Sequence, residues 1–367
     1  MGRFQTMTIY ARHSNDKIHI HTAVFLILVI GISCLFSGCG TEQKKVTKNG
    51  FYFDTIISIT LYGTDDISYI DACFTMAKDY EEKFSNTIKD SEISRINAAG
   101  GKFVTVSDDT IELLTDAIGY GDISQGKFDV TIGGLSDLWN ISEIAENLPS
   151  KDNETDPSVL PKQGDIARAL SHVDYHNIEI KGNQVRLTDP EAKLDVGGIA
   201  KGFIADQMRE YLTKEKITEG VISLGGNVLT LGPKQTGDNY TIGIQKPFAD
   251  TGTAMASLSV KDASVVTSGI YERYYRVEGK LYHHILDTET GYPVDNHLEQ
   301  VTIISKSSMD GDALSTACFA LGLEQGMELI EKTEGVEALF FTDDGAFHWS
   351  SGFDEGKDIQ LRILDVK

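Results

Sequence analysis

Proline and cysteine are scarce in this 367-residue sequence, which contains seven and four residues of these types. Cys34 and Cys39 lie in or next to an N-terminal apolar run, while Cys73 and Cys318 stand in apolar patterns of helical spacing. No Cys-x-x-Cys pair and no Cys/His spacing typical of zinc occurs, which excludes a zinc centre of the common structural kind. We therefore expect Cys73 and Cys318 to be buried free thiols in a fold that depends on its hydrophobic core.

Basic residues are also few, because 33 Lys and Arg stand against 55 Asp and Glu, for a formal net charge of -22. A surface of this sign repels nucleic acid and anionic lipid, so no nucleic acid is expected among the partners. An anionic substrate would need a local cluster of donors or a metal ion to offset the field of the whole chain. The 41% hydrophobic content is sufficient for one large core or two coupled ones.

A long apolar run occurs at residues 23–36 and is too short to span a bilayer comfortably. Basic residues precede it, and a Ser-Gly-Cys triplet that ends at Cys39 follows it. This order is typical of a secretory signal, and it resembles the signal of bacterial lipoproteins, in which Cys39 would be lipidated. We expect a signal peptide over 1–38 and a lipid anchor at the extracytoplasmic face of the cell membrane, with a plain membrane anchor as the alternative.

Periodic patterns divide the rest of the chain. Residues 39–50 are polar and are expected to form a tether, and residues 51–367 to form one catalytic domain with room for two subdomains. Residues 141–163 contain three prolines and are expected to be an exposed excursion. Helices are predicted over 67–85, 90–101 (capped by Asp90 or Ser91), 108–126 (capped by Asp108 or Asp109), 165–173, from within 194–206 to about Leu212, and 311–322 (closed by Gly322).

Segments rich in β-branched and aromatic residues predict strands. Helices and strands mix without a regular βαβ rhythm, which favours an α+β fold: a mixed, largely antiparallel sheet with packed helices. Strands are predicted over 51–63, 220–232, 240–247, 255–269, 272–286 and 299–306, and hairpins over 175–188 and 336–353.

The segment LDVGGIAKGFIAD at 194–206 places two glycines before a lysine. It is neither a Walker loop, because Lys201 is followed by glycine, nor a G-x-G-x-x-G dinucleotide fingerprint. Glycines let the backbone approach an oxygen-rich ligand, and a following helix presents free N–H groups. Lys201 would add a positive charge, and Asp195 could accept a hydrogen bond from a sugar or a ring N–H. A plain turn with an exposed lysine is the alternative.

The segment DGDALST at 310–316 places Asp312 and Thr316 on one helical face, with Ser315 beside them. A carboxylate and hydroxyls form an all-oxygen set that suits magnesium, which keeps some water and often bridges to phosphate. Helix capping by Asp310 or Asp312 is the alternative role.

Two further segments contain candidate functional residues. His284, within 267–291, directly precedes an apolar pair and a turn and is the candidate base, with a structural role as the alternative. Phe128 and Asp129 are expected on a loop between a helix and a strand, where a flat ring beside an acceptor suits an isoalloxazine or an adenine. A core phenylalanine is the alternative there.

In this combination and order the motifs resemble the FAD:protein FMN transferase (ApbE) family, whose fold is ApbE-like or T-fold-like. The resemblance extends over nearly the whole chain after the signal. The matching segments are FDT (53–55), FSNTIKDSEISRIN (84–97), SQGKFDVTIGGL with LW (124–139), LDVGGIAKGFIAD, SLGGN (223–227), IQKP (244–247), TSGIYERYY (267–275), HHILDTETGYP (283–293) and DALSTACFALG (312–322).

The resemblance implies cleavage of the FAD pyrophosphate, transfer of FMN to a Thr hydroxyl of an acceptor protein through a phosphoester, and release of AMP with the help of Mg²⁺. It implies His284 as the base and Lys201 as a charge that neutralises phosphate. It also implies exported or membrane-bound electron-transfer proteins with a Thr-containing motif as acceptors. The implied flavin site is Phe53, Thr87, Lys127, Phe128, Asp129, Asp195, Lys201 and Ile285, and the implied metal site is the Gly198 carbonyl with Asp312, Thr316 and Ser315.

Several positions depart from the family pattern. Phe53 replaces a frequent methionine, Thr87 stands where an aromatic residue is common, and Ser315 stands where some members have a carboxylate. Gly134 and Thr288 replace frequent prolines. Two alternatives to the transferase are an FAD pyrophosphatase that forms FMN and AMP, and a flavin-binding lipoprotein without turnover.

Overall fold

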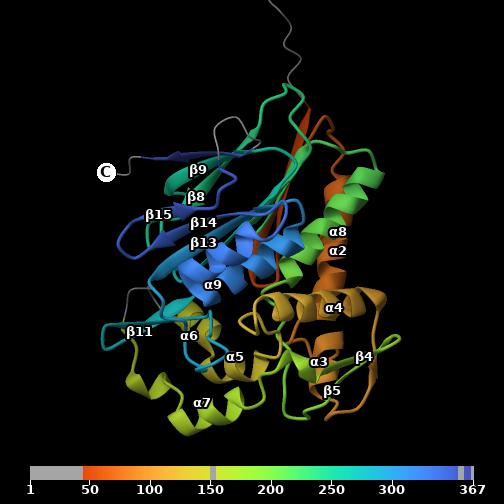
Figure 1. Cartoon of the computed structure of the whole chain (residues 1–367). Helices are drawn as coiled ribbons and strands as arrows, with labels where there is room; N and C mark the ends of the chain where they lie inside the picture. The colour runs from red at the N-terminus through yellow and green to blue at the C-terminus, as the bar shows by residue number, and fades with distance from the viewer. Residues whose placement is uncertain (1–43, 149–153, 354–358, 365–367) are drawn as a thin grey trace, which may run out of the picture. The chain divides into compact units, whose positions relative to one another are not determined.

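The computed structural model describes residues 44–148, 154–353 and 359–364 (Figure 1). The predicted signal peptide over 1–38 and the predicted lipidation site at Cys39 lie outside the described residues. Within the described ranges, no helix is long and apolar enough to cross a bilayer.

An antiparallel sheet of eight strands organises residues 44–364 (Figure 1). Its strands pair in the order β1-β2-β6-β7-β10-β13-β14-β15. The expected α+β class with a largely antiparallel sheet is therefore confirmed. The strands are β1 (Lys45–Tyr52), β2 (Thr55–Tyr62), β6 (Gly220–Leu224), β7 (Asn227–Leu231), β10 (Ser264–Gly269), β13 (Leu298–Ser305), β14 (Glu337–Thr342) and β15 (Phe347–Trp349).

Three smaller sheets accompany it. The sheet β16-β9-β8 packs on one face of the main sheet, where Leu258 of β9 shares a core cluster with Val265 and Ile304. The smaller sheets consist of β8 (Tyr240–Gln245), β9 (Ala254–Val260) and β16 (Gln360–Ile363); of β11 (Tyr274–Val277) and β12 (Lys280–His283); and of β3 (Val104–Thr105), β4 (Ile178–Lys181) and β5 (Gln184–Leu187).

Helices cover the opposite face of the main sheet (Figure 1). Their apolar residues and the inward residues of β2 form the main core, in which Cys73 and Cys318 are buried free thiols, as predicted. The helices are α2 (Ser68–Phe84), α3 (Glu92–Asn97), α4 (Asp108–Ile123), α5 (Gly133–Trp139), α6 (Ile141–Asn147), α7 (Gln163–Leu170), α8 (Ala200–Lys214) and α9 (Ser308–Glu331), with short 3-10 turns at Pro157–Val159 and Tyr175–Asn177.

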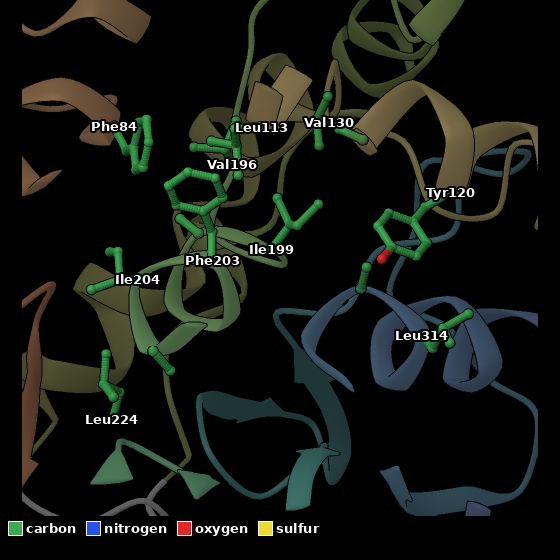
Figure 2. Packing of buried hydrophobic residues seen from close by; sticks show 14 of the residues in the cluster. Phe84, Leu113, Tyr120, Val130, Val196, Ile199, Phe203, Ile204, Leu224 and Leu314 are labelled. Atoms are coloured by element: carbon green, nitrogen blue, oxygen red, sulfur yellow. The ribbon is translucent and has the colours of Figure 1, made fainter. Parts of the chain in front are cut away.

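Phe203 of α8 joins this helix to α2 in the core (Figure 2). Its ring meets the rings of Tyr80 and Phe84 edge-on, with centroid distances of 5.7 and 5.6 Å. Burying a side chain of this size stabilises the fold by about 1.5–3 kcal/mol. The contact holds the first turns of α8 against the C-terminal end of α2.

The prediction of a single strand over 51–63 is wrong, because the chain turns back at Phe53 and Asp54. Both residues have positive φ, of 53° and 54°, which closes a two-residue hairpin between β1 and β2. No Asn-Gly or Asp-Gly pair marks this turn in the sequence. Strand β1 begins at Lys45, so the last six residues of the range expected to be a tether pair with β2.

Other differences are local. Helix α6 lies within the range expected to be an exposed excursion, and the loop after Phe128 leads to helix α5, not to a strand. The residue before α4 is Ser107, not Asp108 or Asp109, whereas Ser91 caps α3 as predicted. Gly322 ends one helical segment at φ 83°, but a second segment follows directly within α9.

Candidate functional site

Lys201 and Asp312 meet where the start of α8 crosses the start of α9. The Lys201 Nζ lies 3.3 Å from Asp312 Oδ1 and donates to the Gly197 carbonyl at 2.7 Å. The backbone N–H of Gly202 donates to Asp312 Oδ2 at 2.9 Å. Asp312 is only 4% exposed, so a lysine and the positive end of a helix compensate its buried charge.

Hydroxyl groups surround the same corner. Ser268, at the end of β10, lies 2.8 Å from Ser315 Oγ and 3.4 Å from Thr316 Oγ1. The Ser315 hydroxyl also donates to the Asp312 carbonyl at 2.9 Å and is fully buried. Ser315 therefore has two partners within the protein, whereas Thr316 makes only a long contact.

Gly198 lies opposite Thr316, in the turn before α8. A Cβ at Gly198 would come within 3.5 Å of Thr316 Oγ1 and 3.3 Å of the Phe128 ring, so a side chain would fill the space between them. The structure thus brings together Gly198, Asp312 and Thr316, as the resemblance implied.

This donor set fits magnesium. No group of three or more His, Cys, Asp or Glu side chains that could hold a metal occurs among the described residues. Magnesium accepts a site of this kind, because it binds through one or two carboxylates and keeps several waters. Asp312, Thr316 and the Gly198 carbonyl offer one carboxylate, one hydroxyl and one backbone oxygen.

Phe128 and Asp129 are both buried, at 3% and 9% exposure. Phe128 packs in the main core with one ring edge toward Gly198. Asp129 accepts from the Thr131 N–H at 2.7 Å and the Tyr175 N–H at 2.8 Å, so its carboxylate holds the loop together. Burial nevertheless raises its pKa above the ordinary value. The alternative roles considered for this pair, core packing and local capping, are both present.

His284 is half-buried and close to the same corner. Burial lowers its pKa well below 6.5, and the positive charge of Arg273 and the neighbouring His283 lower it further, with a smaller effect from Lys201. Its Nδ1 lies 3.3 Å from the Arg273 carbonyl, which can only accept. The proton of the neutral ring is therefore on Nδ1, and Nε2 keeps a free lone pair.

His283 has a structural role. Its Nε2 donates to the Val294 carbonyl at 2.8 Å, and its Nδ1 accepts from the Ile285 N–H at 3.3 Å. Burial lowers its pKa to about 4. Both ring nitrogens are occupied, so of the two adjacent histidines only His284 can serve as a base.

The remaining predicted residues lie around this corner. The Phe53 N–H donates to Glu81 near the end of α2 at 2.6 Å, and Thr87 is exposed on the loop that follows α2. Asp195 accepts from the Gly197 N–H at 2.9 Å and so shapes the turn before α8.

Ile285 is buried beside His284, in the loop that Lys127 contacts. Lys127 Nζ forms ion pairs with Asp287 and Glu289 at 3.0 Å each. Its side chain is thus engaged within the protein.

Sequence reasoning missed several partners at this site. Ser268 belongs to a small hydroxyl turn whose composition could have revealed it. Glu81, Arg273 and Asp287 stand far along the chain from the residues that they contact, and no local pattern indicated these pairings. Two hollows also lie away from this corner: one near Leu323 and His348, the other near Arg209 and Lys306.

Comparisons with known proteins agree with these motifs. The ApbE family model matches residues 53–340. The FAD:protein FMN transferase of Klebsiella pneumoniae (strain 342) is 36% identical, covering 82% of this chain and 90% of the relative. That of Treponema pallidum (strain Nichols) is 30% identical, covering 93% and 96%.

Solved structures are similar over most of their length. The ApbE protein of Thermotoga maritima superposes with a TM-score of 0.75 at 30% identity, covering 84% of this chain and 98% of its own. The flavin transferase ApbE of Vibrio cholerae superposes with a TM-score of 0.74 at 27% identity, with the same coverage.

Proposed function

Because the chain belongs to the ApbE family, we propose that it is an FAD:protein FMN transferase. It cleaves the pyrophosphate of FAD, joins FMN to a Thr hydroxyl of an acceptor protein, and releases AMP. The observation that carries this proposal is the meeting of Lys201, Asp312 and Thr316 at the positive end of α8, with a neutral histidine nearby.

Charge neutralisation is the first task of the site. Two linked phosphates repel a nucleophile, and the leaving AMP takes up negative charge as its P–O bond breaks. Lys201 and the free N–H groups at the start of α8 lie where they can stabilise that charge. Mg²⁺, held by Asp312, Thr316 and the Gly198 carbonyl, would supply further positive charge to the phosphate oxygens.

Proton transfer is the second task. As the Thr oxygen of the acceptor forms its bond to the phosphorus of the FMN half, its proton moves to Nε2 of His284. The lowered pKa keeps His284 unprotonated at neutral pH, so the ring can accept this proton. Arg273 orients the ring through its carbonyl oxygen.

Flavin binding involves backbone and ring surfaces around this corner. The proposed contacts are with Phe53, Thr87 and Asp195, the loop from Lys127 to Asp129, and Ile285. The motifs shared with the family support these assignments.

The proposed location follows from the N-terminal pattern. We propose that Cys39 is lipidated, for instance with a palmitate, and anchors the protein at the extracytoplasmic face of the cell membrane. Its acceptors would then be exported or membrane-bound electron-transfer proteins that present a Thr.

One experiment tests the proposed chemistry. The protein is mixed with FAD, Mg²⁺ and a protein that contains a flavinylation motif, and AMP is measured together with in-gel flavin fluorescence of the acceptor. We expect equal amounts of AMP and flavinylated acceptor. Free FMN in place of labelled acceptor would identify a pyrophosphatase, and retained FAD without AMP would identify a binding protein.

A further inference from the structure

The loop that carries His284 is organised by Asp287, three residues further on. The Asp287 carbonyl accepts from the Gly291 N–H at 2.8 Å, and its Oδ1 accepts from the Glu289 N–H at 3.0 Å. These bonds close the turn after His284, so that a displacement of Asp287 would displace the whole loop.

A second loop is tied to this turn. Lys127 Nζ lies 3.0 Å from Asp287 Oδ1 and 3.0 Å from Glu289 Oε2. The Thr288 hydroxyl donates to the Gly126 carbonyl at 2.8 Å. The 126–127 loop and the turn therefore share one hydrogen bond and two ion pairs.

The two ion pairs differ in burial. Side-chain exposure is 15% for Lys127 and 20% for Asp287, but 73% for Glu289. An exposed pair contributes little because water screens it, whereas removing one partner of a protected pair leaves a charge without compensation. The pair of Lys127 and Asp287 is thus the strong contact.

The two tied loops form opposite sides of the proposed site. Phe128, directly after Lys127, has its ring against Gly198. On the other loop, the His284 N–H donates to the Arg273 carbonyl at 3.2 Å. The distance between the ring of His284 and the turn at Gly198 therefore depends on whether the two loops stay together.

We propose that Lys127 and Asp287 form a clamp that positions His284 for proton transfer, an inference that rests on the proposed transferase activity. Both are positioning residues, since they act through the loop of His284. A displacement of about 1 Å in such a site can reduce the rate about 100-fold. A direct contact of the Lys127 side chain with flavin would act differently, by weakening FAD binding.

The test uses the full chain with FAD and Mg²⁺, and compares Lys127→Gln and Asp287→Asn with the matched control Glu289→Gln. We expect Lys127→Gln and Asp287→Asn each to lower kcat for AMP formation about tenfold, with KM for FAD within about twofold. The double variant should be no slower than either single variant, because the residues act as one unit. Lys127→Arg should recover most of the rate, and Glu289→Gln should match wild type.

A second measurement does not depend on turnover. Hydrogen exchange of the amides in 285–291 should be faster in Lys127→Gln than in wild type or Glu289→Gln. Unchanged exchange, or unchanged kcat beside an active wild type, would overturn the clamp, as would a raised KM with unchanged kcat. A wild-type chain that forms no AMP would instead contradict the proposed function, and the positioning role would fall with it.

Discussion

Gly202 of α8 lies directly against the backbone of Ser308 and Met309 at the start of α9. A Cβ at Gly202 would overlap the Ser308 carbonyl oxygen and would lie 2.6 Å from Met309 Cα. The two helices can cross at this distance only because residue 202 has no side chain. The same crossing brings Lys201 to Asp312, so the packing of two helices and the assembly of the site depend on one glycine.

Gly202→Ala should destabilise the protein by about 1–3 kcal/mol, because the helices must separate to admit the methyl group. It should also lower activity, since Lys201 and Asp312 move apart. Urea denaturation and AMP formation measure the two effects. Gly119→Ala is the matched control, because Gly119 lies within α4 with open space around it and should gain about 0.5–1 kcal/mol. Equal stability of the two variants would contradict the tight crossing.

Asp312→Asn should reduce AMP formation about 100-fold and should raise the magnesium concentration needed for half-maximal rate. The amide keeps the size of the side chain but loses the charge that faces Lys201 and the proposed ion. A magnesium titration of the AMP rate checks both effects. Asp343→Asn, a change at an exposed carboxylate, should leave the titration unaltered. A variant with the wild-type titration would remove Asp312 from the proposed metal site.

The activity should be level from pH 8 to about 6.5 and should fall only below that range. His284 must be unprotonated to accept a proton, and burial lowers its pKa well below 6.5. An ordinary histidine would already be half-protonated near pH 6.5. The measurement is kcat for AMP formation between pH 5 and 8, with His284→Gln expected to lose about 100-fold or more at every pH. A midpoint above 6.5 in the wild type would argue against His284 as the base.

His283 should make the folded protein less stable as the pH falls from about 6.5 toward 4. Its pKa is lowered to about 4 by burial, so the unfolded chain binds a proton in this window before the native protein does. The lost stability approaches about 3 kcal/mol at the acid end, at 1.36 kcal/mol for each unit of pKa difference. The free energy of unfolding in urea, at pH 7.5 and pH 5, should fall less in His283→Gln than in wild type. An identical fall in both would contradict this assignment.

Much of the local structure could be predicted from the sequence. The helical spacing of apolar residues indicated α2, α4 and α8, and the turn residues indicated the hairpins β4–β5 and β14–β15. Ser91 was identified as a helix cap because its side chain needs only the N–H of Ser94, three residues further on. Features of this kind depend on contacts within one turn of the chain. The hairpin at Phe53 and Asp54 was missed, because neither residue type marks a left-handed turn as glycine does.

The sequence by itself determined the family motifs, the periodic faces of the helices and the residue types available for chemistry. Only the tertiary structure decided which of them meet: Asp312 with Gly202 across 110 positions of the chain, and Lys127 with Asp287 across 160. It also decided that His283 has both ring nitrogens occupied while His284 keeps one free. The physical reason is range, since propensity and capping act over a few residues, whereas these contacts depend on how strands and helices from distant segments pack.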